Sequence, residues 1–183
     1  TSSLVGSEMC IRDRCNILSE LNYEIVYIGG CSDMNTEKVL MERNHVRFYK
    51  TPLYGGNGMQ RIIQQWKYRR YVLEMLKNEY VKETTYLWLL HSETVSLFSA
   101  YLDKYDVISH LFEFKNPTQK IAYRLLNPCY PFEKNLKKSK KVICCEYNRA
   151  HITKSIYDLD KVPYILPNKP YNGNVQIAQS LPF

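Results

Sequence analysis

The sequence contains no apolar run approaching the roughly 18 residues that a membrane-spanning helix needs. It has six cysteines in 183 residues and no C-x-x-C pair, so a disulfide scaffold is excluded and a structural zinc site gains no support. No repeat of about 20–50 residues is visible, which excludes a solenoid. Hydrophobic residues nevertheless make up 45% of the chain and charged residues 23%. This balance excludes a disordered chain and predicts a packed domain with reduced thiols.

The charge is biased toward the basic side, with a formal net charge of +7. Such a bias favours anionic partners, namely phosphates, nucleic acid or a lipid surface, and carries no information about the fold.

Residues 4–13 read LVGSEMCIRD and resemble one reading frame of a transposon-based sequencing adapter. They do not fit a signal peptide, because Glu8, Arg12 and Asp13 fall where an apolar stretch should lie. We therefore interpret residues 1–14 as adapter-derived and exclude them from the fold argument. Residues 15–171 are then the expected domain, and 172–183 a polar linker toward a second domain. On this interpretation the chain is a fragment.

From residue 15 onward, β-type runs alternate with stretches of helical spacing. The expected strands are 23–28, 46–49, 86–90, 106–112, 142–145 and 164–166. The expected helices are 16–21, 33–43, 59–80, 94–102, 117–126 and 147–157. Strands separated by helices imply right-handed crossovers and a parallel sheet. The predicted fold is therefore α/β, a Rossmann-like three-layer sandwich with a mainly parallel sheet.

Ligands of such sheets bind beyond the carboxyl ends of the strands, so the residues at these ends are the candidates for a site. A histidine and a carboxylate follow the run at 86–90, a second such pair lies at the end of the next run, and a glutamate and an arginine follow the run at 142–145. An asparagine follows the last run. The candidates are His91, Glu93, His110, Glu113, Glu146, Arg149 and Asn168.

Each candidate also has a purely structural explanation. Ser92 or Thr94 is expected to cap the following helix. His110 lies inside an apolar run, so a satisfied core histidine is as good an interpretation as a site residue. Arg149 could bind a phosphate or carboxylate, or it could form an ion pair with Glu146 or Glu113.

The cysteines do not suggest a site of their own. Cys144 and Cys145 are adjacent on an expected strand and should point to opposite faces, so a metal site with Cys129 and His151 is disfavoured. Burial of the VICC run predicts inert thiols. No metal and no cofactor is expected.

The segments VICCEYNRAHI (142–152) and LDKVPYILPNKPY (159–171) resemble the end of the N-terminal domain of GT-B glycosyltransferases of the family-4-like, group-1 bacterial type. The run DVISHLFEF (106–114) looks like the acceptor-side strand of that family. The resemblance implies an enzyme that moves a sugar from a nucleotide-sugar donor to a glycan or lipid-linked acceptor in cell-surface polysaccharide synthesis. The donor would bind mainly to a second domain, and the fragment alone would be inactive.

The same resemblance implies roles for the candidate residues. His110 and Glu113 would be catalytic. The expected substrate-binding residues are His91, Glu93, Glu146, Arg149 and Asn168. The implied location is the cytoplasm, with the inner face of the membrane as an alternative.

The basic charge and the aromatic residues suggest two other kinds of partner. Single-stranded nucleic acid is suggested by the sixteen tyrosines, the basic charge and the KKSKK run at 137–141. The tyrosines are dispersed and the lysines precede a buried strand, so no nucleic-acid partner is expected. Peripheral membrane contact is suggested by the long helix, although a core position for Trp66 is the simpler explanation. The residues that suggest it are Arg61, Trp66, Lys67, Arg69, Arg70 and Tyr71.

Overall fold

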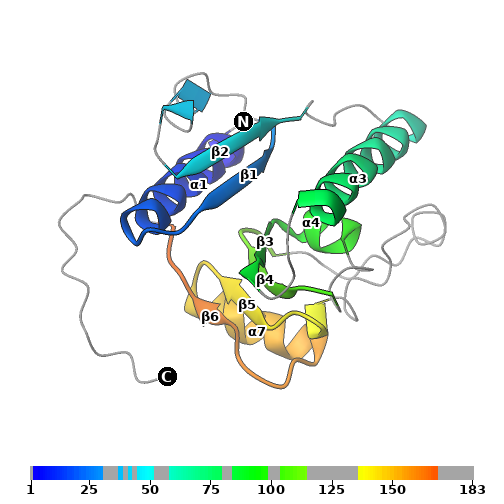
Figure 1. The fold of residues 1–183 in the computed structure, drawn as a ribbon. Coiled ribbons are helices and arrows are strands. Elements are labelled where there is room, and N and C mark those ends of the chain that lie inside the picture. The colour runs from blue at the N-terminus through cyan, green and yellow to red at the C-terminus, as the bar shows by residue number, and fades with distance from the viewer. Residues whose placement is uncertain are drawn as a thin grey trace. The chain divides into compact units, whose positions relative to one another are not determined.

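The computed structural model of the chain describes residues 2–30, 37–38, 41–42, 45–51, 58–79, 84–98, 104–114 and 136–168. Of residues 2–9, 78–79, 93 and 96 it describes the backbone alone. The chain divides into two compact units (Figure 1). One comprises Thr1–Pro52 with Asn168–Phe183, and the other comprises Leu53–Pro167.

The first unit contains one helix and a two-stranded parallel sheet. Helix α1 (Ser2–Glu20) packs against strand β1 (Ile25–Gly29), which pairs with β2 (Val46–Lys50). The helix ends in a Schellman motif: Asn22 has φ 61°, and the amide of Tyr23 donates to the carbonyl oxygen of Leu18 at 3.0 Å. Helix α1 runs without a break across residue 14, the boundary suggested by the adapter-like string.

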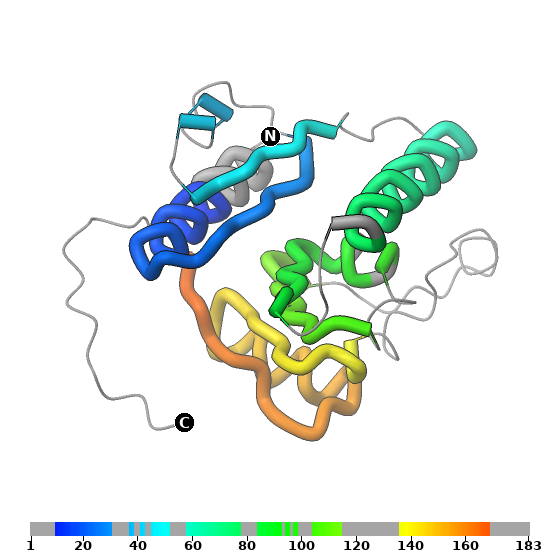
Figure 2. Tube along the Cα trace, viewed as in Figure 1, coloured from blue at the N-terminus to red at the C-terminus, as the bar shows by residue number. Residues whose placement is uncertain are grey.

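The second unit is built on a four-stranded sheet in the order β3-β4-β5-β6, with every neighbouring pair parallel. The strands are β3 (Tyr86–Leu90), β4 (Asp106–Leu111), β5 (Lys141–Cys144) and β6 (Tyr164–Ile165). Figure 2 follows the trace of this unit from the green β3 to the orange β6. The helices are α3 (Met59–Glu79), α4 (Ser92–Leu97) against β3 and β4, and α7 (Tyr147–Tyr157) against β5 and β6.

The predicted α/β class with parallel strands is confirmed, and each predicted strand is present within two residues of its expected bounds. The expectation of one sheet is wrong for the described strands. β1 and β2 pair with each other, whereas β3 to β6 form a second sheet in the other unit. The predicted helix 117–126 lies outside the described residues, as does most of the helix expected at 33–43.

The core of the second unit is centred on β4, which has partners on both sides. Val107, Ser109, His110 and Leu111 are all buried. Helix α4 packs against β3 and β4, and Val95, Leu97 and the C-cap residue Phe98 are each at most 2% exposed. On α7 the buried side chains are Ala150, Thr153 and Tyr157. The buried residues of β4, α4 and α7 therefore supply the core of the second unit.

Replacing Leu97 by alanine should lower the free energy of unfolding by about 2–5 kcal/mol, because it leaves a cavity at a site only 2% exposed. Leu166→Ala is the matched control, since Leu166 belongs to the same unit and is 36% exposed. Urea denaturation followed by circular dichroism measures both variants. Equal losses would show that α4 does not pack as described.

Candidate functional site

The ends of β3, β4 and β5 form one edge of the sheet, which we call the carboxyl edge (residues 91, 111–113 and 145–149). Parallel register brings Leu90 beside His110 and Leu111 beside Cys144. His91, Glu113, Glu146 and Arg149 directly follow these strands, so the fold brings together candidates that lie up to 58 positions apart, from 91 to 149. This is the position in a parallel sheet where a ligand is expected to bind.

His91 has an unusual backbone conformation at this edge, with φ 70° and ψ 152°. This region is populated almost only by glycine and costs about 1–3 kcal/mol for other residues. The His91 amide donates to the His110 carbonyl oxygen at 3.0 Å. Its half-buried ring contacts the Phe112 ring, with centroids 4.7 Å apart. The conformation therefore ties the end of β3 to β4 and directs the imidazole along the edge.

The predicted helix caps at Ser92 or Thr94 are wrong. His91 occupies the N-cap position of α4, and its side chain makes no capping hydrogen bond. The reason is that the helix begins immediately at the strand end, which leaves Ser92 and Thr94 inside the helix.

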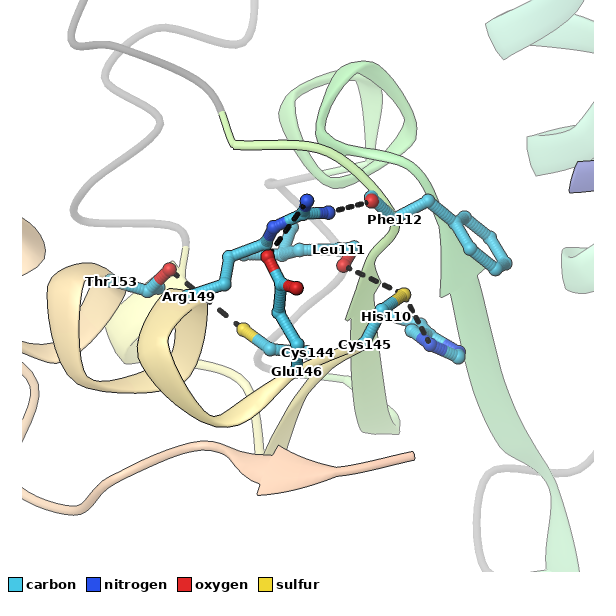
Figure 3. Close-up of polar contacts among 8 residues, drawn as sticks. All are labelled: His110, Leu111, Phe112, Cys144, Cys145, Glu146, Arg149 and Thr153. Atoms are coloured by element: carbon cyan, nitrogen blue, oxygen red, sulfur yellow. Dashed lines mark hydrogen bonds and ion pairs between the residues drawn. The ribbon is translucent and has the colours of Figure 1, made fainter. Parts of the chain in front are cut away.

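Arg149 is the central polar side chain of the carboxyl edge (Figure 3). One guanidinium nitrogen donates to the carbonyl oxygen of Phe112, and another lies 3.0 Å from the Glu146 carboxylate. Of the two ion-pair partners considered for Arg149, the structure therefore selects Glu146. The Arg149 side chain remains 27% exposed. Because a guanidinium carries five N–H donors, Arg149 can hold the edge together and still donate to a ligand.

Glu146 occupies the N-cap position of α7, and its side chain makes no capping hydrogen bond. The carboxylate is favoured at this end of a helix by the peptide dipoles. It is 60% exposed. A carboxylate here disfavours a second anion at the same place, so the edge suits a neutral hydroxyl-bearing ligand better than a phosphate.

His110 is completely buried in β4. Its ring stacks on Phe112 at 4.5 Å between centroids, and Trp88 lies at 6.0 Å. His110 therefore has the surroundings of a core histidine, which was the structural explanation considered for it. A solvent-borne substrate cannot reach this imidazole in the described conformation, so it is a less accessible candidate than His91.

The two adjacent cysteines lie in different environments. Cys144 is fully buried, and its sulfur lies 3.8 Å from the Thr153 hydroxyl on α7. Burial raises the pKa of the Cys144 thiol, as expected for an inert cysteine. Cys145 is only half-buried, and its sulfur lies near Leu111 and His110 of β4. The prediction that both thiols are buried is therefore wrong for Cys145.

The remaining candidates differ in what the structure describes. Glu113 is exposed directly after β4. Glu93 lies in the first turn of α4, and its side chain is outside the described part of the chain. Asn168 belongs to the first unit, where its side-chain oxygen accepts a hydrogen bond from Arg14 at 2.9 Å. The structure therefore does not place Asn168 with the other candidates.

Sequence reasoning missed Phe112 and Cys145. Phe112 supplies the carbonyl that binds Arg149 and the ring that lies against both His91 and His110. The available signal was its position between two candidates, His110 and Glu113. For Cys145 the available signal was its position at the end of an expected strand, next to Glu146. Of β5 itself only Cys144 is buried, so the predicted buried strand is only partly so.

Helix α3 has a second, exposed apolar face. Gln65, Val72, Met75 and Leu76 are buried, whereas Ile63 and Trp66 are 49% and 47% exposed. The core position expected for Trp66 is therefore wrong. A groove of about 670 Å³ runs along this face, between Ile63, Trp66 and Leu73 and charged side chains. These are the cations Lys67, Arg70 and Lys77 and the carboxylate of Glu74, which lies 2.8 Å from Arg70.

Two lysines of the basic run at 137–141, Lys137 and Lys140, pair with neighbouring acids. Lys137 lies 2.7 Å from Asp158, whose pKa is lowered mainly by this hydrogen bond. Lys140 binds Asp106, and that bond raises the pKa of the lysine. These cations are thus partly neutralised, which weakens the case for a nucleic-acid surface here.

Comparison with known proteins gives no relative: no family model matches the chain, and neither a curated protein nor a solved structure matches it. Within the described ranges, no group of three or more His, Cys, Asp or Glu side chains could hold a metal ion. Of the helices that the structure describes, none is long and apolar enough to cross a bilayer.

Two substitutions at His91 separate backbone strain from side-chain contact. His91→Gly and His91→Ala both remove the ring, but only glycine accepts φ 70° and ψ 152° without strain. We expect the glycine variant to be more stable than the alanine variant by about 1–2 kcal/mol in urea denaturation. An alanine variant that is as stable as the glycine variant would contradict the described conformation of residue 91.

Proposed function

We propose that the second unit belongs to the acceptor-binding half of a glycosyltransferase, an enzyme that moves a sugar from a nucleotide-sugar donor to an acceptor hydroxyl. The observation that supports this most is the convergence of His91, Glu113, Glu146 and Arg149 on the carboxyl edge of a parallel sheet. The resemblance of residues 142–171 to the GT-B group supplies the reaction class. The parallel sheet agrees with a three-layer GT-B domain and is common to many other α/β proteins.

The chemistry of the edge suits a sugar acceptor. Sugar hydroxyls both donate and accept hydrogen bonds, and the edge offers exposed carboxylates at Glu113 and Glu146 together with the guanidinium donors of Arg149. The half-buried His91 ring can accept a proton or a hydrogen bond. In this proposal His91 and Glu113 face the acceptor hydroxyl, and Arg149 positions the sugar.

His110 has a different role in the proposal. Because it is fully buried behind Phe112, it acts as a positioning residue for the edge rather than as a group in contact with the acceptor. Asn168 lies in the other unit and Glu93 has no described side chain, so neither carries the proposal.

Titration of the ¹⁵N-labelled chain with a panel of mono- and disaccharides tests the acceptor role. We expect shifts of the amide resonances of residues 91, 113 and 146–149. The dissociation constants should be in the millimolar range, which corresponds to a binding free energy of about 4 kcal/mol in magnitude. Arg149→Gln should weaken the affinity about tenfold, because it removes a charge-assisted donor. Arg70→Gln on α3 is the matched control and should leave saccharide binding unchanged.

The same titration with nucleotide sugars distinguishes the alternatives. Shifts at the carboxyl edge with a nucleotide sugar and none with saccharides would make this the donor side instead. Shifts confined to the opposite ends of the strands, or no shifts with either class, would contradict the proposal.

We also propose that the exposed face of α3 contacts an anionic lipid surface, as suits an enzyme with a lipid-linked acceptor. The face combines Ile63, Trp66 and Leu73 with the cations Lys67 and Lys77, while Arg70 pairs with Glu74. Arg69 lies 5.3 Å from the centre of the Trp66 ring. An apolar stripe bordered by cations is complementary to the headgroup region of an anionic bilayer. Trp66 is 47% exposed and available for this contact.

Co-sedimentation with vesicles tests the lipid contact. The chain should bind phosphatidylcholine vesicles that contain phosphatidylglycerol and bind pure phosphatidylcholine vesicles weakly. Trp66→Ala should weaken binding about tenfold. Tyr86→Ala should not, since Tyr86 is an aromatic residue on β3 that lies outside this face and is even more exposed (61%). Equal losses for the two variants would contradict a contact through α3.

A further inference from the structure

We infer that Cys145 is a reactive thiol, activated by His110, that forms a mixed disulfide with low-molecular-weight disulfides. The Cys145 sulfur lies 4.0 Å from Nε2 of His110 and 3.7 Å from the carbonyl oxygen of Leu111. Figure 3 shows both contacts at the ends of β4 and β5. The inference concerns the carboxyl edge but does not depend on sugar transfer.

The two neighbours of the thiol have different roles. A carbonyl oxygen can accept a hydrogen bond from the S–H group, but only the imidazole can take its proton. The Leu111 carbonyl therefore fixes the position of the sulfur, and His110 is the base. Transfer of the proton gives a thiolate paired with an imidazolium, and the thiolate is the nucleophilic form of cysteine.

Aromatic rings surround the imidazole of His110. Its ring is stacked on Phe112, with centroids 4.5 Å apart and planes 21° from parallel, and the Trp88 ring lies at 6.0 Å. Aromatic faces attract a cation, most strongly where water is excluded. His110 is 0% exposed, and burial disfavours a charged imidazole, so an imidazolium that has taken the thiol proton depends on the adjacent thiolate and aromatic faces for its stabilisation.

The neighbouring Cys144 provides an internal comparison. Alternation along the strand directs Cys144 toward Thr153 on α7, where it is fully buried and burial raises its pKa. Cys145 as a residue is half-buried, whereas Cys144 is 0% exposed, so Cys145 is the more accessible of the two to a small reagent. Two adjacent cysteines thus differ in both access and environment, and only Cys145 has a base beside it among the described contacts.

The reaction is a thiol–disulfide exchange. The Cys145 thiolate attacks one sulfur of the disulfide, a new S–S bond forms, the original S–S bond breaks, and the second half leaves as a thiolate. The proton of Cys145 remains on His110. The product carries its added group at the carboxyl edge, where Arg149 and Glu146 also lie, so modification would block that edge until a reducing thiol removes the group.

The experiment uses 5,5′-dithiobis(2-nitrobenzoate), whose released thiolate is coloured, on the full chain and on Cys145→Ser and Cys144→Ser. The other cysteines are the same in every variant, so the lost amplitude identifies each thiol. We expect Cys145→Ser to remove a phase about tenfold faster than the one that Cys144→Ser removes. In denaturant the two thiols should react at similar rates.

The pH profile tests the role of His110. The rate for Cys145 should fall by less than tenfold per pH unit below about 8.5, the ordinary thiol pKa, because the ion pair maintains the thiolate. His110→Gln should restore the ordinary tenfold fall. If His110→Gln does not fold, the pH dependence of the Cys145 rate in the wild-type chain tests the inference by itself. A simple break near 8.5, or equal rates for Cys145 and Cys144 in the folded chain, would overturn the inference.

Discussion

The parallel pairing of β4 between β3 and β5 is the interaction on which the rest of the second unit depends. It sets the register that places His91, Phe112 and Arg149 at one edge, and it buries the ring of His110. Two bonds to the end of β4 then fix the edge: the His91 amide binds the carbonyl of His110, and Arg149 binds the carbonyl of Phe112. Without this central strand, His91 would lose its contact with Phe112, and Arg149 its bond to the Phe112 carbonyl oxygen.

Regular structure was predictable because the signals for it are local. The run YLWLL forms β3 with the predicted bounds, 86–90, and α7 likewise begins at Tyr147 and ends at Tyr157. A short continuous apolar run bounded by polar residues marks a strand, and apolar positions three and four apart mark a helix. The order of these elements then predicts parallel pairing. The order of the elements along the chain could not predict the division into two sheets, because that division depends on pairing between distant segments.

The candidate site was predictable in position but not in detail. The ends of parallel strands lie at one edge of a sheet. His91, Glu113, Glu146 and Arg149 could therefore be selected from the sequence alone. The strained backbone of His91, the bond from Arg149 to a main-chain carbonyl and the contact between Cys145 and His110 depend on packing between elements. Their residue types carry no sequence signal for these contacts. Trp66 shows the converse, since an aromatic residue on an amphipathic helix was expected inside and lies 47% exposed.

The two bonds that fix the end of β4 share one property, which is that both acceptors are main-chain oxygens. Main-chain oxygens are supplied by every residue, so substitutions at positions 110 and 112 would leave the acceptors in place. The donor side differs: only an arginine has the reach and the forked geometry to hold Phe112 and Glu146 together. In divergent chains with this architecture, position 149 would thus stay constant while position 112 drifts among residues of similar bulk.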